Sequence, residues 1–167
     1  DITVLPITEE WGFASKTVLG YPNEYRIRNL LQCVGSKKIF WKADSLIKQK
    51  PCVRLDPNGI AQGYSADLIA DNLESRGVYN YMIEIGGEMR IKGVKENDKP
   101  FVISIEKTGN DPWVMSSNPR QIAPGDGAIT TSGNCRKFVQ SNGKHISHII
   151  DARTGNTARN ELISVTV

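Results

Sequence analysis

The fold is decided by residues 55–77, which read LDPNGIAQGYSADLIADNLESRG. The first part, DPNG (56–59), has the composition of a turn, and Asn58 or Gly59 is a suitable cap for a helix that follows it. Apolar residues then recur at helical spacing, and Gly77 suits the left-handed position just past a helix end. The stretch therefore predicts a turn that leads directly into a long helix.

The segments on either side predict one more helix and a series of short strands. Upstream, apolar residues at helical spacing favour an amphipathic helix over 24–34, ended by Gly35. Residues 38–55 predict two strands around a polar turn, and Pro51 makes the second an edge strand, because proline has no amide to donate to a neighbouring strand. Further strands are expected at 79–85, 89–93, 101–106, 128–131, 136–140, 146–150 and 162–167, with a hairpin turn at 141–144. Two helices followed by strands on hairpin connections favour an α+β fold with a largely antiparallel sheet.

Length and composition are typical of one globular domain. The chain has 167 residues, 39% of them apolar and 23% charged, and a domain typically takes about 150 residues. This composition argues against a collagen, a coiled coil or a disordered chain. We therefore expect a single domain over 1–167. Because the sequence starts with Asp1 rather than Met and stops within an apolar alternation, we also expect it to be a fragment.

Charge and cysteine content exclude some partners. The net charge is +3, and the basic residues are scattered, whereas a nucleic-acid binder usually gathers them on one face, so no nucleic-acid partner is expected. No apolar run approaches the roughly 20 residues that cross a bilayer. Cys33, Cys52 and Cys135 are far apart, odd in number and without a C-x-x-C pair, which argues against zinc. Buried free thiols are predicted instead.

Three glycine-rich turns stand at the ends of expected strands, at 57–63, 85–93 and 130–134. Backbone amides in such turns can form an anion-binding concavity, and the first turn opens a helix, where a phosphate can bind. None matches a P-loop or a dinucleotide fingerprint, and each alone is more typical of an ordinary tight turn than of a ligand site. Asp56 is either a turn opener before proline or a carboxylate that binds a metal or ligand. Together the turns favour a domain that binds a nucleotide.

The two histidines, His145 and His148, lie three residues apart on an expected strand. Their side chains would point to opposite faces, so a shared metal is not expected. His148 is followed by Asp151 and Arg153 at a junction of strand and turn, which favours a functional site over a purely structural histidine. Ser132 would complete a Ser-His-Asp set, but no G-x-S-x-G motif supports it.

Taken together, five blocks resemble one enzyme family. They are DITVLPITEEWGF (1–13), LDPNGIAQGYSADLIADNL (55–73), MIEIGGEMRIKG (82–93), ITTSGNCRKF (129–138) and HIIDARTG (148–155). In this order and spacing they resemble the FAD:protein FMN transferases of the ApbE type, most of all the Bacteroidetes branch. The resemblance implies an α+β architecture related to the T-fold. It also implies a Mg²⁺-dependent reaction that cleaves the pyrophosphate of FAD, releases AMP and attaches FMN to a threonine or serine of a target flavoprotein.

The resemblance further implies which residues bind FAD and metal. Asp1 matches the acidic residue of the family's first FAD-contacting motif, and Asp56 matches the aspartate that opens the second. Gly59 occupies the position whose backbone carbonyl ligates the metal. Gln62 stands where many members have a lysine or glutamate that contacts FAD, so the charge of that side chain is lost here.

The later blocks imply the reaction centre. Thr131 and Ser132 match a turn near the nucleotide, where Cys135 replaces a usual tyrosine. His148 matches the family's histidine at the reaction centre, and we expect it to act as the general base on the acceptor hydroxyl or to align the phosphate. Arg153 lies where a basic residue reaches the nucleotide.

Family members extend beyond both ends of this sequence. Their other metal ligands follow the HIID motif by some twenty residues, and a further N-terminal segment usually carries a lipoprotein signal. We therefore expect a protein on the periplasmic side of a bacterial membrane, held there by a lipid anchor that this chain lacks. Two alternatives stay open: a protein that binds or hydrolyses FAD without transferring FMN, and an inactive fragment that keeps only the fold.

Overall fold

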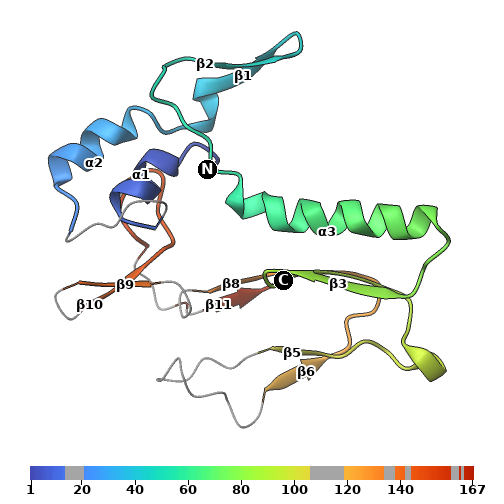
Figure 1. Cartoon of the computed structure of the whole chain (residues 1–167). Coiled ribbons are helices and arrows are strands. Elements are labelled where there is room, and N and C mark those ends of the chain that lie inside the picture. Colours follow the sequence, from blue (N-terminus) through green and yellow to red (C-terminus); the bar gives the residue numbers. More distant parts are fainter. Residues whose placement is uncertain (14–20, 106–118, 134–137, 142–143, 159–161, 163) are drawn as a thin grey trace. The chain divides into compact units, whose positions relative to one another are not determined.

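The computed structural model describes residues 1–13, 21–105, 119–133, 138–141, 144–158, 162 and 164–167 (Figure 1). The chain divides into two compact units. Unit 1 comprises Asp1–Pro57 and Arg136–Glu161, and unit 2 comprises Asn58–Cys135 and Leu162–Val167. In the described part of the chain, no helix combines the length and the apolar character needed to cross a membrane.

In its described residues, unit 1 contains two short α-helices, one 3₁₀ turn and two antiparallel hairpins. They are α1 (Leu5–Glu10), α2 (Glu24–Leu31), η1 (Ser36–Lys38), β1 (Ile39–Lys42) paired with β2 (Ser45–Lys48), and β9 (Phe138–Ser141) paired with β10 (Lys144–Ser147). The side chain of Asn23 caps α2 by accepting the Tyr25 amide at 2.8 Å. The core of the unit joins residues from both of its segments: Ile7, Trp11, Ile27, Val34 and Ile146.

Several predictions for unit 1 are confirmed, and others need correction. The two strands expected in 38–55 and the hairpin at 141–144 are present, although residues 142 and 143 lie outside the described part of the chain. The helix expected over 24–34 ends at Leu31, and β2 ends before Pro51. Helix α1 was not expected, because its six residues are too few to show a periodic pattern.

Cys33 and Cys52 form a disulfide, with their Cα atoms 5.5 Å apart. The prediction of free thiols is therefore wrong for these two residues, while Cys135 lies outside the described residues. The physical reason is the β1–β2 hairpin, which carries the chain out and back, so that cysteines 19 positions apart in the sequence meet. Sequence spacing alone does not reveal such an encounter.

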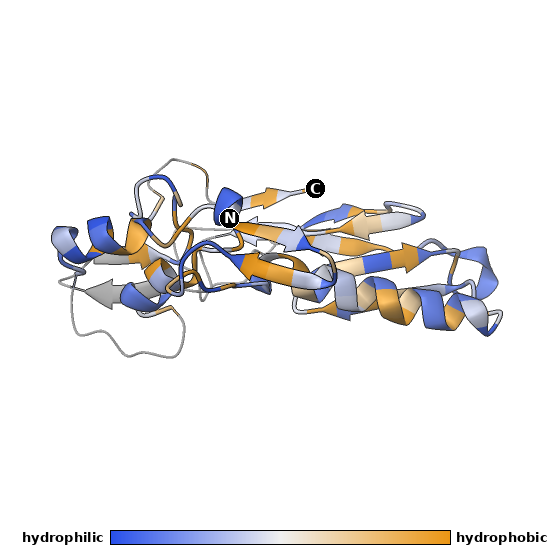
Figure 2. Cartoon of the chain, turned by 90° about the horizontal axis from the view of Figure 1, so that it is seen from above, coloured by the Kyte–Doolittle hydropathy of each residue, from blue (hydrophilic) through white to orange (hydrophobic). Residues whose placement is uncertain are grey.

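The described part of unit 2 consists of a three-stranded antiparallel sheet with one long helix and two further strand pairs. Its elements are α3 (Asn58–Ser75), β3 (Tyr81–Ile85), β4 (Glu88–Lys92), η2 (Glu96–Asp98), β5 (Ile103–Ile105), β6 (Arg120–Ile122), β7 (Gly127–Ile129), β8 (Thr131–Gly133) and β11 (Ser164–Thr166). The sheet has the order β3-β4-β7, and β5 pairs with β6 and β8 with β11. Apolar and polar residues alternate along α3 (Figure 2).

The long helix predicted from residues 55–77 is confirmed, including its end. The amide of Gly77, at φ +79°, donates to the Glu74 carbonyl, and the amide of Val78 donates to the Leu73 carbonyl, which is a Schellman motif. Near this end the Glu74 carboxylate accepts hydrogen bonds from the Lys92 ammonium at 2.8 Å and the Tyr81 hydroxyl at 2.5 Å. These bonds lower the pKa of the Glu74 carboxyl. They also connect the end of α3 to strands β3 and β4 of the sheet.

The disulfide predicts a measurable thiol count and a loss of stability on its removal. In the unreduced, unfolded protein a thiol reagent should detect the Cys135 thiol alone, and after reduction all 3 cysteines. Cys52→Ser should lower the free energy of unfolding by about 2–4 kcal/mol, because the bond restricts the unfolded chain. Cys135→Ser is the matched control. Three reactive thiols without reduction would contradict the assignment.

Candidate functional site

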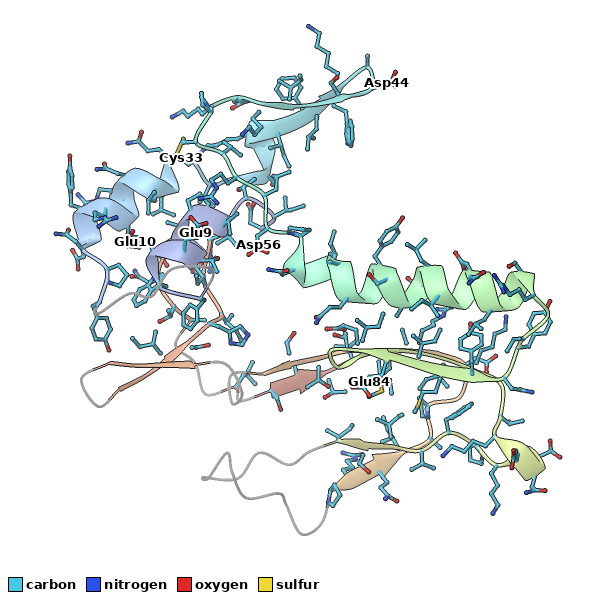
Figure 3. All side chains as sticks on the ribbon, viewed as in Figure 1. Glu9, Glu10, Cys33, Asp44, Asp56 and Glu84 are labelled. Carbon is cyan, nitrogen blue, oxygen red and sulfur yellow. A yellow bond between two sulfur atoms is a disulfide. The ribbon has the colours of Figure 1, made fainter. Side chains whose placement is uncertain are left out.

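Asp1 and Asp56, the two carboxylates predicted to contact FAD, both lie in unit 1, on segments that touch. The backbone amide of Asp56 donates to the carbonyl of Ile2 at 2.7 Å, so the start of the chain lies beside the segment that precedes α3 (Figure 3). Asp1 and Asp56 are 55 positions apart in the sequence, and this hydrogen bond joins the two segments that carry them.

The Asp1 carboxylate already has a structural task. One oxygen accepts the Thr3 amide at 2.9 Å and the Thr3 hydroxyl at 2.8 Å, and the other accepts the Ser36 amide at 3.0 Å. The buried Thr3 hydroxyl in turn accepts the Gly35 amide at 2.6 Å. A carboxylate can accept about four hydrogen bonds, so a ligand would share Asp1 with this turn.

The segment that carries Asp56 is held in place by three kinds of contact. The disulfide fixes it at Cys52, the Val53 side chain is fully buried, and the Arg54 guanidinium forms a bidentate pair with the Glu9 carboxylate on α1, with Nη2 and Oε1 at 2.7 Å. Bidentate arginine–carboxylate pairs fix orientation as well as distance. Asp56 therefore stands on a rigid support.

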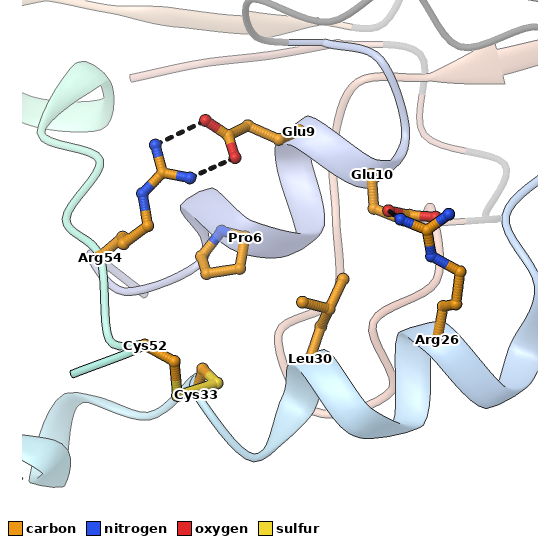
Figure 4. A pocket seen from close by; sticks show the side chains of 8 residues that line it. All are labelled: Pro6, Glu9, Glu10, Arg26, Leu30, Cys33, Cys52 and Arg54. Carbon is orange, nitrogen blue, oxygen red and sulfur yellow. Dashed lines mark hydrogen bonds and ion pairs between the residues drawn. A yellow bond between two sulfur atoms is a disulfide. The ribbon is translucent and has the colours of Figure 1, made fainter. Parts of the chain in front are cut away.

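A pocket of about 270 Å³ lies beside this segment, within unit 1 (Figure 4). Its wall contains two ion pairs, Glu9 with Arg54 and Glu10 with Arg26, the latter at 2.9 Å. Because each carboxylate is neutralised by an arginine, the two ion pairs together carry no net charge that would attract an anion or a cation into the pocket. None of the residues predicted for the site lines this pocket.

His148 and Arg153 lie in one loop of unit 1, residues 148–155. Arg153 is in a turn closed by an antiparallel bridge between Ile150 and Thr157, in which the Asp151 carbonyl accepts the amides of Thr154 and Gly155, and His148 precedes this bridge by two residues. The partly buried imidazole of His148 meets the ring of Phe13 edge to face, with ring centroids 6.3 Å apart. The side chain of His145 lies outside what the structure describes.

Arg153 is exposed but paired. Its side chain is 89% accessible to solvent and donates two hydrogen bonds of 3.0 Å to the Asp151 carboxylate. The Arg153 side chain and backbone amide lower the pKa of the Asp151 carboxyl. A phosphate could share this guanidinium, since it carries five donors, of which Asp151 takes two.

Sequence reasoning missed the part that Trp11 plays in this loop. The Trp11 indole N–H donates to the Gly155 carbonyl at 2.8 Å, a buried hydrogen bond across 144 positions. The signal was present in the quoted block DITVLPITEEWGF, but neither spacing nor periodicity indicates a contact so distant in the sequence.

Unit 2 carries the other predicted residues. Gly59 and Gln62 lie in the first turns of α3, and the Gln62 amide occupies the space beside Gly86, where an added Cβ would stand 2.1 Å from Nε2. Thr131 and Ser132 lie exposed in β8, opposite β11. Gly59 and Gln62 thus share one helix end, and Thr131 and Ser132 share one strand.

The described residues do not form a magnesium site. Among them no three His, Cys, Asp or Glu side chains are grouped as metal ligands. Gly59 lies in the first turn of α3, where a carbonyl ordinarily accepts the amide four residues later and keeps one lone pair.

The conformation and close packing of the loop predict that only glycine at position 155 preserves full stability. Gly155 has φ +70°, and an added Cβ would lie 2.6 Å from the Ile27 side chain, whereas Gly125 has φ +73° with no atom within 4 Å. Gly125→Ala should cost about 1–2 kcal/mol of unfolding free energy, from backbone strain alone. Gly155→Ala should cost about 1–3 kcal/mol more, from overpacking. Equal losses in denaturant unfolding would contradict the close contact.

The Asp151–Arg153 pair predicts a pH dependence. Because the folded-state pKa of Asp151 lies below the ordinary value of 3.8, the pair contributes stability above pH 3.8 and loses it as the pH falls through the folded-state pKa. An NMR titration of the Asp151 carboxyl carbon should show the low pKa, and Arg153→Gln should return it toward 3.8. A pKa that is the same in both proteins would contradict the pairing.

Curated relatives align with this chain over its whole length. A protein from Vibrio cholerae described as FAD:protein FMN transferase is 39% identical over 170 residues, which cover 100% of this chain and 49% of the relative. One from Haemophilus influenzae with the same description is 34% identical over 174 residues, covering 100% and 49%. The chain spans about half the length of the curated relatives it matches.

Solved structures share its fold. Flavin transferase ApbE from Vibrio cholerae superposes with a TM-score of 0.84 at 35% identity, over 99% of this chain and 52% of that one. The apo form of the flavinyl transferase ApbE from Pseudomonas stutzeri gives 0.82 at 30% identity, over 99% and 50%. The predicted α+β fold is thereby confirmed. The model of the ApbE family matches residues 1–167, and the chain therefore belongs to the ApbE family.

Proposed function

We propose that the protein is an FAD:protein FMN transferase, which cleaves the pyrophosphate of FAD, transfers FMN to a threonine or serine of a target flavoprotein and releases AMP. The observation that carries the proposal is the match of the chain, from first residue to last, to the ApbE family and to relatives described by that activity. Because the chain spans about half of those relatives, the proposal concerns the full-length protein.

The reaction is a displacement at phosphorus. The acceptor hydroxyl oxygen forms a bond to the phosphorus of the FMN half, the bond from that phosphorus to the bridging oxygen breaks, and AMP leaves with this oxygen. We assign the hydroxyl proton to the imidazole of His148, since histidine exchanges protons readily near neutral pH. The alternative role of His148 is to align the phosphate. Arg153, on the same loop, would stabilise the charge that gathers on the departing phosphate.

The residues that match the family's FAD-contacting motifs would bind FAD. Asp1 and Asp56 supply acceptors for N–H and O–H groups of the flavin or adenosine, and the hydrogen bond from the Asp56 amide to the Ile2 carbonyl, which brings the backbone of their segments together, supports a shared role. Gln62 supplies an uncharged amide in place of the charged residue found in many members. Thr131 and Ser132 supply exposed hydroxyls near the nucleotide.

The proposal includes a requirement for Mg²⁺, the cation that most commonly accompanies phosphate transfer. Gly59 is the residue of this chain that matches a family metal ligand, through its carbonyl. The remaining ligands would come from outside the described residues.

We also propose that the protein works on the periplasmic side of a bacterial membrane, attached by a lipid anchor. The Cys33–Cys52 disulfide supports this placement, because disulfides persist in oxidising compartments and are rare in the cytosol. Recovery of the reduced protein from the cytosolic fraction of its native cells would contradict it.

The proposed activity predicts AMP release that depends on metal and on His148. Liquid chromatography should detect AMP from FAD in the presence of Mg²⁺, with EDTA as the negative control. His148→Ala should lower the turnover about 10²–10⁴-fold if the imidazole is the base, because the acceptor proton then has no positioned receiver. His145→Ala is the matched control. An unchanged rate in His148→Ala would remove this role.

The same assay separates the alternatives. It is run on this chain and on the full-length product of its gene, with a flavoprotein acceptor present. FMN recovered covalently on the acceptor supports the transferase, whereas free FMN indicates hydrolysis. AMP from the full-length product alone would mean that this chain keeps the fold without a complete site, and no AMP from either would contradict the proposed function.

A further inference from the structure

We propose that Trp11 and Phe13 are positioning residues, which hold the loop of residues 148–155 so that His148 and Arg153 stand ready for the reaction. The inference rests on the proposed function. It gives a role to the motif Trp11-Gly12-Phe13, for which the family resemblance implies none.

The two aromatic residues are presented by the end of α1. The Gly12 amide donates to the Glu9 carbonyl and the Phe13 amide donates to the Thr8 carbonyl, each at 3.0 Å, and Gly12 has φ +82°. This is a Schellman motif, in which Gly12 takes the left-handed position that other residues adopt at a cost. The motif fixes the direction of the chain between Trp11 and Phe13.

Trp11 forms a hydrogen bond with Gly155, at the C-terminal end of the loop. Its ring is buried, and its indole N–H donates to the Gly155 carbonyl at 2.8 Å. On another side of Gly155 lies Ile27, and an added Cβ would stand 2.6 Å from that side chain, so only glycine fits where the loop packs on α2. A buried hydrogen bond of this kind selects one position of the loop, since moving the carbonyl would leave the indole N–H unsatisfied.

Phe13 contacts His148, at the N-terminal end of the loop. Its ring meets the imidazole of His148 edge to face, at an interplanar angle of 69° and a centroid distance of 6.3 Å. Aromatic pairs prefer this arrangement, so Phe13 restricts the orientation of the imidazole plane. Restricting that plane matters for a base, because the nitrogen must point at the proton it receives.

The loop is therefore held at both ends by one helix terminus. Between the two contacts lie the backbone hydrogen bonds of Asp151 and the Asp151–Arg153 pair. Loss of either aromatic contact should loosen the turn, so that its internal hydrogen bonds open more often and the loop shifts relative to α1. Misplacement of about 1 Å can reduce a rate 10²-fold, so such a shift would be visible in catalysis.

The first experiment measures the loop directly, by hydrogen exchange of backbone amides in the full-length protein. Trp11→Phe removes the indole donor and keeps an aromatic ring, and it should speed the exchange of the Thr154 and Gly155 amides about tenfold. Trp41→Phe is the matched control, at a tryptophan 73% exposed on the β1–β2 hairpin. Wild-type exchange rates in Trp11→Phe would overturn the inference.

The second experiment is a double-mutant cycle on AMP release. Phe13→Leu should lower kcat about tenfold or more with little change in the KM for FAD, and in a His148→Ala background it should cause no further loss, because Phe13 acts through that imidazole. Phe40→Leu, on the exposed hairpin, is the control. An equal loss in both backgrounds would show general destabilisation and overturn the positioning role.

The two experiments keep the inference separate from the proposed function. If the wild-type protein releases no AMP, the proposed function fails, while hydrogen exchange still shows whether Trp11 holds the loop. If the wild-type protein is active and both aromatic variants match it in exchange and in kcat, the inference alone fails.

Discussion

Unit 1 depends on the docking of its late segment onto its first helix, which the hydrogen bond from Trp11 to the Gly155 carbonyl makes specific. The core around it takes residues from α1 and α2 together with Ile146 and Ile150. Without this contact, residues 1–57 would have a core open on one side, and the loop of His148 would have no fixed place. One indole N–H thus links the stability of the unit to the geometry of the site.

The parts of the fold that could be predicted are those with strong local signals. Helix α3 carries a turn before it and the Schellman glycine Gly77 after it, and the hairpin of β9 and β10 carries a turn sequence. Helix α1 was not predicted, since six residues show no helical period, and β8 (Thr131–Gly133) is a strand where a glycine-rich turn was expected at 130–134. The Cys33–Cys52 bond could not be predicted because it depends on the path of a hairpin rather than on spacing.

The candidate site was predicted through resemblance more than through chemistry. Composition and spacing indicated backbone anion sites and a histidine of interest, and only the ordered blocks pointed to particular roles for Asp56, His148 and Arg153. What holds these residues could not be read from the sequence: the Arg54–Glu9 pair beside Asp56 and the ring of Phe13 beside His148 are contacts between distant segments. Such contacts depend on tertiary packing, which leaves no periodic trace in the chain.

The disulfide has one more consequence, which concerns the continuity of the chain. Residues 33–52 form a covalently closed loop that contains the whole β1–β2 hairpin and its exposed Trp41. Exposed hairpin tips are where proteases most readily cut a folded protein. A cut between Cys33 and Cys52 would leave the two pieces joined through sulfur, with α2 on one and the segment of Asp56 on the other. The nicked protein would keep its fold and gain only the mass of one water, and it would fall into two pieces only when the sulfur bridge is reduced and the fold is lost.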